Sequence, residues 1–233
     1  MSDVLKVGLV CEGPTDRIVI NAATASLLGD RDFLLVQLQP EDSLAFGATG
    51  TGWAGVYRWC RQAADQGGGS LRGNALFEFY DVLILHIDVD VTSRTYESGN
   101  IVTSRSDLPC PPRPCPPFSD SADLLRGVVL GWIGEGAIPP RAVFCTPSKS
   151  TEAWVLAALF PTDPVVLSGM LECHPAPANL ISAKPIGERL KKTVRSYQER
   201  AGAITQDWAR VRRLCSEAER FSTDFLAEIP IAA

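Results

Sequence analysis

The chain has 233 residues and a net charge of −5 at pH 7, with 45% apolar and 21% charged residues. This composition excludes wholesale disorder, which needs low hydrophobicity and high net charge. No run of about 18 apolar residues is present, so the sequence predicts no transmembrane helix. The N-terminal Met-Ser-Asp-Val also lacks the basic region of a secretory signal. We therefore expect a cytoplasmic protein with no membrane partner.

The first third of the chain alternates between strand and helix patterns. The strands are short runs rich in β-branched residues. Pro14 suits the first position of a helix, and Gly29 suits the position just past its end. The predicted elements, in order, are a strand at 4–11, a helix at 14–28, a strand at 33–38, a glycine-rich acidic loop at 40–52 and a helix at 53–66.

The middle of the chain continues the alternation. Residues 81–87 (DVLILHI) are almost entirely apolar, which is typical of a parallel strand covered on both faces. Residues 91–118 hold six prolines and are predicted to be an inserted loop. A helix at 120–135, a strand at 142–145 and a helix at 150–159 follow. The order predicts an α/β fold with a mostly parallel, four-stranded sheet flanked by helices.

The last third has a different character and is predicted to be a helical C-terminal extension. We divide the chain into an α/β domain at 1–160 and the extension at 161–233, with helices at 186–202 and 206–227. Between Lys184 and Arg213 the sequence has nine Lys and Arg against three Asp and Glu. This basic excess fits either a solvated helix face or a surface that follows a phosphate backbone.

Seven cysteines are present, and several lie in apolar runs. Without a secretory signal, we expect reduced thiols. Cys110 and Cys115 flank a proline-rich stretch, but no second cysteine pair or histidine pair completes a four-ligand zinc site.

Charged side chains follow three of the predicted strands. Ligands of parallel α/β sheets bind beyond the carboxyl ends of the strands, so these positions are candidate site residues. They are Glu12 and Asp16 after the first strand, Asp88 and Asp90 after the third, and Lys149 and Glu152 after the fourth.

The spacing of these residues predicts a cation site. In extended backbone Asp88 and Asp90 point to the same side, and Glu12 and Asp16 face one crevice across a strand-to-helix turn. Crowded carboxylates repel one another unless cations bind, and hard oxygen ligands suit Mg²⁺ or Mn²⁺. Two such ions about 3.5–4 Å apart can bind the attacking and leaving oxygens of a phosphodiester, with Lys149 stabilising the transition state.

Each of these residues also has a structural interpretation. Asp16 suits the positive end of a helix dipole. The two aspartates after residues 81–87 could simply solvate a strand end, and Glu12 could be part of a turn. Lys149 and Glu152 could be helix-start charges, with Ser150 as the cap. We expect His86, inside the apolar strand, to be a satisfied core histidine, with support of a metal ligand as the alternative.

The motif Glu12-Gly-Pro-Thr-Asp16 after one strand and Asp88-Val-Asp90 after a later strand resembles the Toprim domain of topoisomerases, primases and OLD-type nucleases. The segment Lys149-Ser-Thr-Glu152-Ala-Trp154 is similar to one that follows in OLD-type and small stand-alone Toprim proteins of bacterial defence systems. The resemblance covers roughly residues 4–160.

The resemblance implies roles for the six charged residues. It implies that Glu12 is a metal ligand and general base, that Asp88 and Asp90 hold metal, and that Lys149 stabilises the transition state. Asp16 and Glu152 would complete a second metal site.

The function expected from the motifs is a Mg²⁺- or Mn²⁺-dependent nuclease acting on DNA or RNA in antiviral defence. Its ATPase partner would be a separate chain, and its oligomeric state stays open. One alternative is a Toprim subunit with weak catalysis that acts as a sensor or binding partner. Another is a haloacid-dehalogenase-like phosphatase, because Asp88-Val-Asp90-Val-Thr92 matches that family's DxDxT motif, whose first Asp is a nucleophile.

Overall fold

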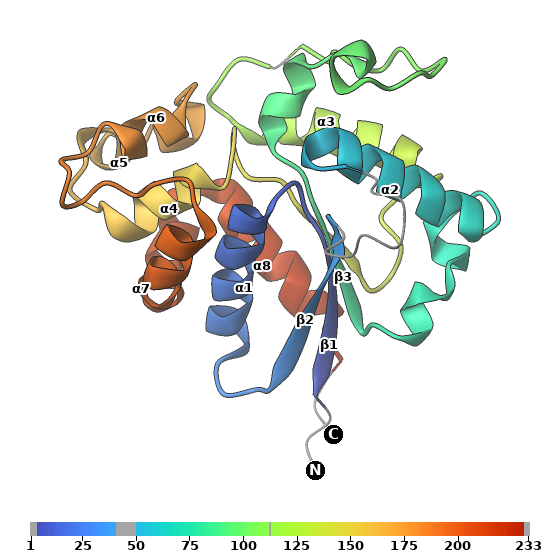
Figure 1. Cartoon of the computed structure of the whole chain (residues 1–233), viewed down its shortest axis with the longest axis horizontal. Coiled ribbons are helices and arrows are strands. Elements are labelled where there is room, and N and C mark those ends of the chain that lie inside the picture. The colour runs from blue at the N-terminus through green and yellow to red at the C-terminus, as the bar shows by residue number, and fades with distance from the viewer. Residues whose placement is uncertain (1–3, 41–49, 112, 231–233) are drawn as a thin grey trace.

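The structure is a computed structural model that describes residues 4–40, 50–111 and 113–230. In these residues a four-stranded, all-parallel sheet has helices on both faces (Figure 1). The strands are β1 Leu5–Val10, β2 Phe33–Gln39, β3 Val82–His86 and β4 Ala142–Cys145, in the spatial order β2-β1-β3-β4. The predicted α/β fold is confirmed. Most of the glycine-rich loop predicted at 40–52 lies outside the described residues, as does residue 112 of the insertion.

The longer helices divide between the two faces of the sheet. On one face α1 Pro14–Leu28, α4 Glu152–Leu159, α7 Val194–Leu214 and α8 Ser216–Glu228 share a core with β1. On the other face α2 Gly52–Gln66 and α3 Ser119–Trp132 cover β3. The short helices α5 Pro164–Leu167 and α6 Pro177–Ser182 follow α4. Every residue of β3 is buried, as its continuous apolar pattern predicts.

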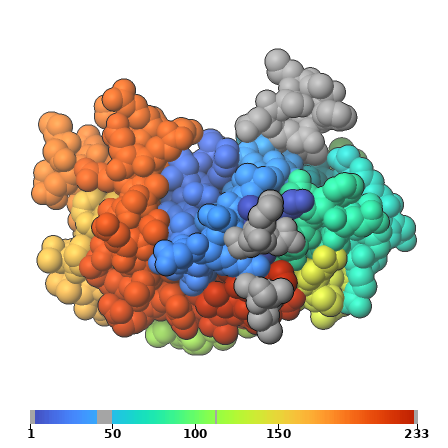
Figure 2. All heavy atoms as spheres, turned by 90° about the horizontal axis from the view of Figure 1, so that it is seen from below, coloured from blue at the N-terminus to red at the C-terminus, as the bar shows by residue number. Residues whose placement is uncertain are grey.

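The C-terminal extension is part of the main core. Tyr197, Ile204 and Trp208 of α7 are buried with α1 and α4, and the ring of Trp208 meets Trp154 edge-on with centroids 5.3 Å apart. Seen from below, orange and red C-terminal residues lie beside blue N-terminal ones on the surface (Figure 2). The extension therefore completes the hydrophobic layer over α1, and its fold holds the start of α4 in place.

The predicted bounds of the last two helices are wrong. Helix α7 begins at Val194, where the hydroxyl of Thr193 accepts a hydrogen bond from the Ser196 amide, and the segment before it is irregular. Its apolar spacing continues through Trp208 to Val211, so α7 runs across the predicted break at 203–205. The insertion predicted as a loop at 91–118 also contains two short 3₁₀ helices, Val89–Ser93 at its start and Tyr96–Gly99.

The expectation that all seven cysteines are reduced is also wrong. Cys115 and Cys173 form a disulfide with Cα atoms 5.6 Å apart, although 58 residues separate them in sequence. The bond joins the proline-rich insertion to the C-terminal extension. No sequence spacing indicates this pair, because only the folded chain brings its two halves together. The free cysteines are Cys11, Cys60, Cys110, Cys145 and Cys215.

Candidate metal centre

The carboxyl ends of β1 and β3 lie side by side, and this brings the first two candidate acids together. The amide of Asp88, two residues past β3, donates a hydrogen bond of 2.9 Å to Oε1 of Glu12, two residues past β1. A separation beyond about 10 Å would have prevented these acids from sharing a pair of ions. The parallel pairing of β1 with β3 therefore places Glu12 against the backbone that carries Asp88.

Asp16 reaches the same place from the first turn of α1. Its side chain is buried, and its Oδ1 accepts a 2.7 Å hydrogen bond from the hydroxyl of Thr151. Thr151 is the residue before the first turn of α4, but its hydroxyl does not cap that helix. The contact instead ties the start of α4 to the start of α1, so that Asp16 faces the strand ends.

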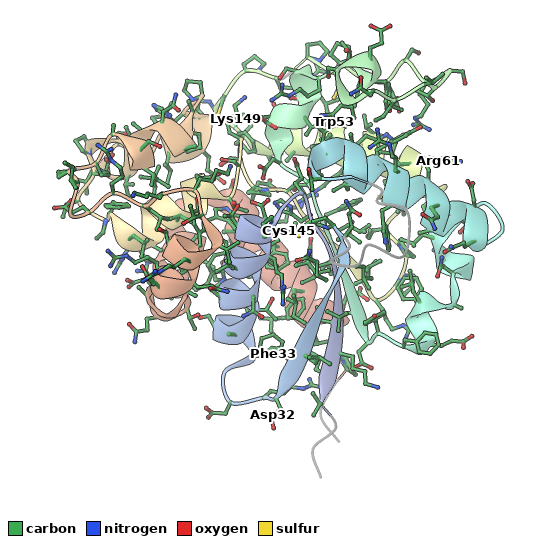
Figure 3. All side chains as sticks on the ribbon, in the orientation of Figure 1. Asp32, Phe33, Trp53, Arg61, Cys145 and Lys149 are labelled. Carbon is green, nitrogen blue, oxygen red and sulfur yellow. A yellow bond between two sulfur atoms is a disulfide. The ribbon has the colours of Figure 1, made fainter. Side chains whose placement is uncertain are left out.

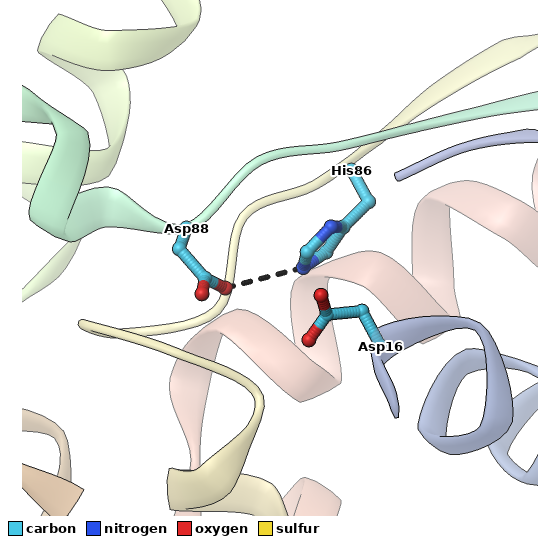
Figure 4. Close-up of side chains that lie close together, drawn as sticks. All are labelled: Asp16, His86 and Asp88. Atoms are coloured by element: carbon cyan, nitrogen blue, oxygen red, sulfur yellow. Dashed lines mark ion pairs between the residues drawn. The ribbon is translucent and has the colours of Figure 1, made fainter. Parts of the chain in front are cut away.

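His86, the last residue of β3, completes the centre of this cluster. Its imidazole has no exposed surface, and its Nε2 lies 3.2 Å from Oδ1 of Asp88. Asp16, His86 and Asp88 each offer one ligand atom, and these three atoms all lie within 4.8 Å of one another. Figure 4 shows the Asp16 carboxylate and the Asp88 carboxylate on either side of the ring's tip.

The expectation of a satisfied core histidine is wrong. Neither ring nitrogen of His86 has a hydrogen-bond partner among the described residues, and the close approach to Asp88 does not have hydrogen-bond geometry. The signal was present in the sequence, because residues 86 and 88 are two apart at the end of a strand and share a side. What the sequence could not show is that neither ring nitrogen has a hydrogen-bond partner among the described residues.

Glu152, which is buried, adds a fourth acid from the first turn of α4. Its Oε1 accepts a hydrogen bond from the hydroxyl of Tyr197 at 3.1 Å and forms an ion pair with Nζ of Lys192 at 2.9 Å, whereas its Oε2 has no hydrogen-bond partner among the described residues. Lys192 lies in the irregular segment before α7 and was missed by the sequence reasoning, which assigned it to a basic helix face. It brings a cation from the extension to the acid cluster.

Most other charges of the basic stretch do not reach the site. Arg195 pairs with Glu199 along α7, and Arg212 pairs with Glu219 of α8. Such ion pairs are typical of a solvated helix surface, which is one of the two interpretations of the excess of Lys and Arg between residues 184 and 213. Lys192 is different because its partner is a buried carboxylate.

Asp90 and Lys149 lie at the edge of the cluster. Asp88 has extended backbone, but a 3₁₀ helix begins at Val89, so the expectation that Asp90 continues an extended strand is wrong. The Asp90 carboxylate is 45% exposed and lies 3.5 Å from the guanidinium of Arg94. The hydroxyl of Thr92 donates to the Val89 carbonyl and stabilises this turn.

Lys149 is held in an unusual backbone conformation. Its φ is +59°, in the left-handed region that non-glycine residues seldom adopt. It lies above Cys145, the last residue of β4, at the carboxyl edge of the sheet (Figure 3). Its ammonium group makes no ion pair with the described residues. Burial raises the pKa of the Asp90 carboxyl, and the charge of Lys149 opposes that rise. Such strain is often found at functional positions.

The electrostatics of the cluster oppose a fully ionised state. Burial, together with the charge of Asp88, raises the pKa of Glu12 well above its usual range. Burial, with the charges of Asp16 and Glu152, raises the pKa of Asp88 in the same way. Burial alone would also raise the pKa of Glu152, but the Lys192 ammonium together with the hydrogen bonds to this carboxylate outweighs burial, and the net pKa is lowered. The cluster therefore has several acids but only one lysine, Lys192, in an ion pair with any of them among the described residues.

The donor atoms fit a divalent cation. Oδ1 of Asp88 and Oε2 of Glu152 are buried without hydrogen bonds to the described residues, as are both nitrogens of His86. Buried polar atoms of folded proteins are normally paired, and an exception indicates a missing partner such as water or an ion. Ionised carboxylate oxygens only accept, and a neutral imidazole has one acceptor nitrogen beside one N–H donor, so a cation suits the carboxylates and one nitrogen of the ring.

Comparisons with known proteins identify no relative: no family model, curated protein or solved structure matches the chain. Among the described helices, none is both long enough and apolar enough to cross a lipid bilayer.

Proposed function

We propose that the chain is a metal-dependent nuclease of Toprim type that hydrolyses nucleic-acid phosphodiesters with Mg²⁺ or Mn²⁺. The observation that supports this most directly is the hydrogen bond from the Asp88 amide to Glu12, because it joins the two separate halves of the acidic motif. Asp16 and Glu152 then surround the same point from α1 and α4. Four acids from three strand ends around unpaired oxygen atoms are what a phosphodiester-cleaving cation site requires.

The residues have distinct proposed roles. Asp16, Asp88 and Glu152 would hold cations, which supply Lewis-acid polarisation of the phosphate and an attacking water of lowered pKa. Glu12 is oriented by the Asp88 amide, and its raised pKa makes it a better proton acceptor for that water near neutral pH. Asp90 is placed to join as an outer ligand, since its carboxylate is half exposed beside Asp88.

Two lysines would stabilise the developing negative charge. Lys149, with its strained backbone and free ammonium group, and Lys192, on the opposite segment, both act electrostatically on Asp90. Cations at Glu152 would compete with Lys192 for that carboxylate, and Lys192 would then be available to a phosphate oxygen. The wider setting that the motif resemblance implies is cytoplasmic antiviral defence, with an ATPase on a separate chain.

The test is cleavage by the purified chain. Supercoiled plasmid and single-stranded RNA are incubated with Mg²⁺, with Mn²⁺ or with EDTA, and cleavage is expected only with a divalent cation. Glu12→Gln should lower the rate about a thousandfold, because it removes the proposed general base. The matched control is Asp30→Asn, since Asp30 is an exposed acid in the turn after α1 and should leave the rate unchanged.

Other outcomes identify the alternatives. Turnover of a small phosphomonoester that is insensitive to Glu12→Gln would favour the phosphatase with Asp88 as nucleophile. Absence of cleavage together with a stable co-purifying protein would favour a binding or sensor subunit. Either result would contradict the nuclease.

A further inference from the structure

The imidazole of His86 is the feature that the acid cluster alone does not explain. Only carboxylates would be needed for a magnesium site, yet a fully buried histidine ends β3 at the centre of the cluster. Both of its nitrogens lack hydrogen-bond partners among the described residues. The ring's Nε2 points toward the space between Asp88 and Asp16 (Figure 4).

The usual structural roles of a buried histidine do not account for this ring. A histidine that orients a neighbouring side chain donates or accepts a hydrogen bond, and His86 does neither toward the described residues. Its contact with Asp88 is close, at 3.2 Å, but is not a hydrogen bond. A metal ion coordinated by Nε2 would give this nitrogen a partner. It could also be coordinated by Oδ1 of Asp88, which has no hydrogen bond to the described residues.

We propose that His86 is a metal ligand, which together with Asp16 and Asp88 forms a mixed imidazole–carboxylate site that selects a divalent transition-metal ion over Mg²⁺. The selection follows from ligand chemistry, because Mg²⁺ prefers oxygen ligands and keeps its waters, whereas transition-metal ions accept imidazole nitrogen readily. This inference deepens the proposed function and rests on it only for the existence of the cation site.

Direct spectroscopy of the bound ion tests the assignment in the full chain. Mn²⁺ is added to the purified protein, and electron spin-echo modulation from ¹⁴N is recorded. We expect nitrogen coupling of the kind that imidazole ligation produces. Calorimetric titration should also show Mn²⁺ binding at least about tenfold more tightly than Mg²⁺. Manganese that binds without nitrogen coupling, or that binds no more tightly than Mg²⁺, would overturn the proposal.

The chain offers a matched control because it has only two histidines. His174 lies in the extension, where its Nδ1 accepts a hydrogen bond from the Ala176 amide. His174→Asn should keep the nitrogen coupling and the Mn²⁺ affinity. His86→Asn should lose the coupling and about tenfold or more in Mn²⁺ affinity, while Mg²⁺ affinity changes by less than about threefold. The wild-type measurement needs no variant, so it decides the question even if His86→Asn does not fold.

The two proposals can fail separately. Nitrogen-coupled Mn²⁺ in a protein that cleaves no nucleic acid would contradict the nuclease and support the histidine ligand. Metal-dependent cleavage without nitrogen coupling would do the reverse. Failure of Mn²⁺ to bind at all would contradict both.

Discussion

Two clusters of buried charge lie at the ends of neighbouring strands, and they differ in how the charge is balanced. Beyond β4, Nη2 of Arg126 lies 2.7 Å from Oε2 of Glu217, and Nε donates a 3.0 Å hydrogen bond to the hydroxyl of Thr146. That hydroxyl in turn donates to Glu217. The guanidinium, the carboxylate and the hydroxyl therefore hydrogen-bond to one another and join α3, α8 and the end of β4, although burial raises the pKa of Glu217 to about 8.

The cluster beyond β1 and β3 has no such balance. Asp16, Asp88 and Glu12 gather around the His86 imidazole, which lies 3.2 Å from Asp88 but has no hydrogen-bond partner among the described residues. The ion-paired cation Lys192 belongs to Glu152 and is 65% exposed. A buried charge network that is closed within the chain stabilises the fold and needs nothing further. A network with excess charge of one sign and unpaired atoms needs a partner from outside. This difference in charge balance distinguishes a structural cluster from a candidate binding site.

The largest expected effect on stability comes from opening the balanced cluster. Arg126→Met should lower the free energy of unfolding by about 3–5 kcal/mol, because Glu217 is left buried without its cation. Urea unfolding measures the change. The control is Arg195→Met, since Arg195 is 89% exposed and pairs with Glu199 at the surface, where the loss should stay below about 1 kcal/mol. Equal losses in the two variants would mean that the buried network is no stronger than a surface pair.

The next effect concerns the disulfide, which supports the neighbourhood of the balanced cluster. Cys173 follows Glu172, whose carboxylate accepts hydrogen bonds from the amides of Ser216 and Glu217 at the start of α8. Cys173→Ser opens a loop of 58 residues and should cost up to about 4 kcal/mol of unfolding free energy. Thermal and urea unfolding measure it, with Cys110→Ser as the control for a free cysteine of the same insertion. Mn²⁺ affinity should be unchanged, and a large drop would show that the two clusters are coupled.

The contrast between the clusters also marks how far the sequence could predict the molecule. The alternation of apolar runs and helix signals is sufficient to predict the parallel sheet. The rule that ligands bind at the carboxyl ends of strands also predicts from the sequence that Glu12 and Asp88 lie close together, as they do. Both depend on local pattern. By contrast, Lys192 meets Glu152 only because α7 packs on α1 and α4, and nothing local to residue 192 indicates that packing.

The same distinction explains the errors at Asp90 and His86. Alternation predicted that Asp90 shares the side of Asp88, but the chain turns into a 3₁₀ helix directly after Asp88, and the side-chain period of a strand no longer applies. His86 was correctly placed on the side of the acids. Its lack of partners depends on every neighbouring element, so the sequence could only supply the usual expectation for a buried histidine.

A smaller effect comes from removing charge from the unbalanced cluster. The pKa of Asp88 is raised by burial and by Asp16 and Glu152, so the native state holds this proton more tightly than the unfolded state. Stability from this source is full only below the ordinary aspartate pKa of about 4 and is lost progressively as pH rises from there toward the native pKa. In EDTA, Asp88→Asn should therefore raise the free energy of unfolding relative to wild type. At pH 8 we expect roughly 1 kcal/mol for each unit by which the native pKa of Asp88 exceeds its unfolded pKa, and at pH 5 we expect less. Urea unfolding at both pH values measures this, and destabilisation at pH 8 would show that the acid is already balanced.

The smallest expected effect tests whether Lys192 acts as a substitute for the missing cation. In EDTA, Lys192→Gln should lower the free energy of unfolding by less than about 1 kcal/mol, because the lysine is mostly exposed and its ion pair with Glu152 is screened by solvent. With saturating Mn²⁺ the difference from wild type should disappear, since the ion then neutralises the carboxylates that Lys192 faces. Lys191→Gln, at an exposed neighbouring position, is the control and should show no metal-dependent change. If the loss of unfolding free energy in Lys192→Gln persisted in Mn²⁺, the lysine would be a fixed structural partner of Glu152. The charges of the acid cluster would then be balanced within the chain, as they are in the Arg126–Glu217 cluster.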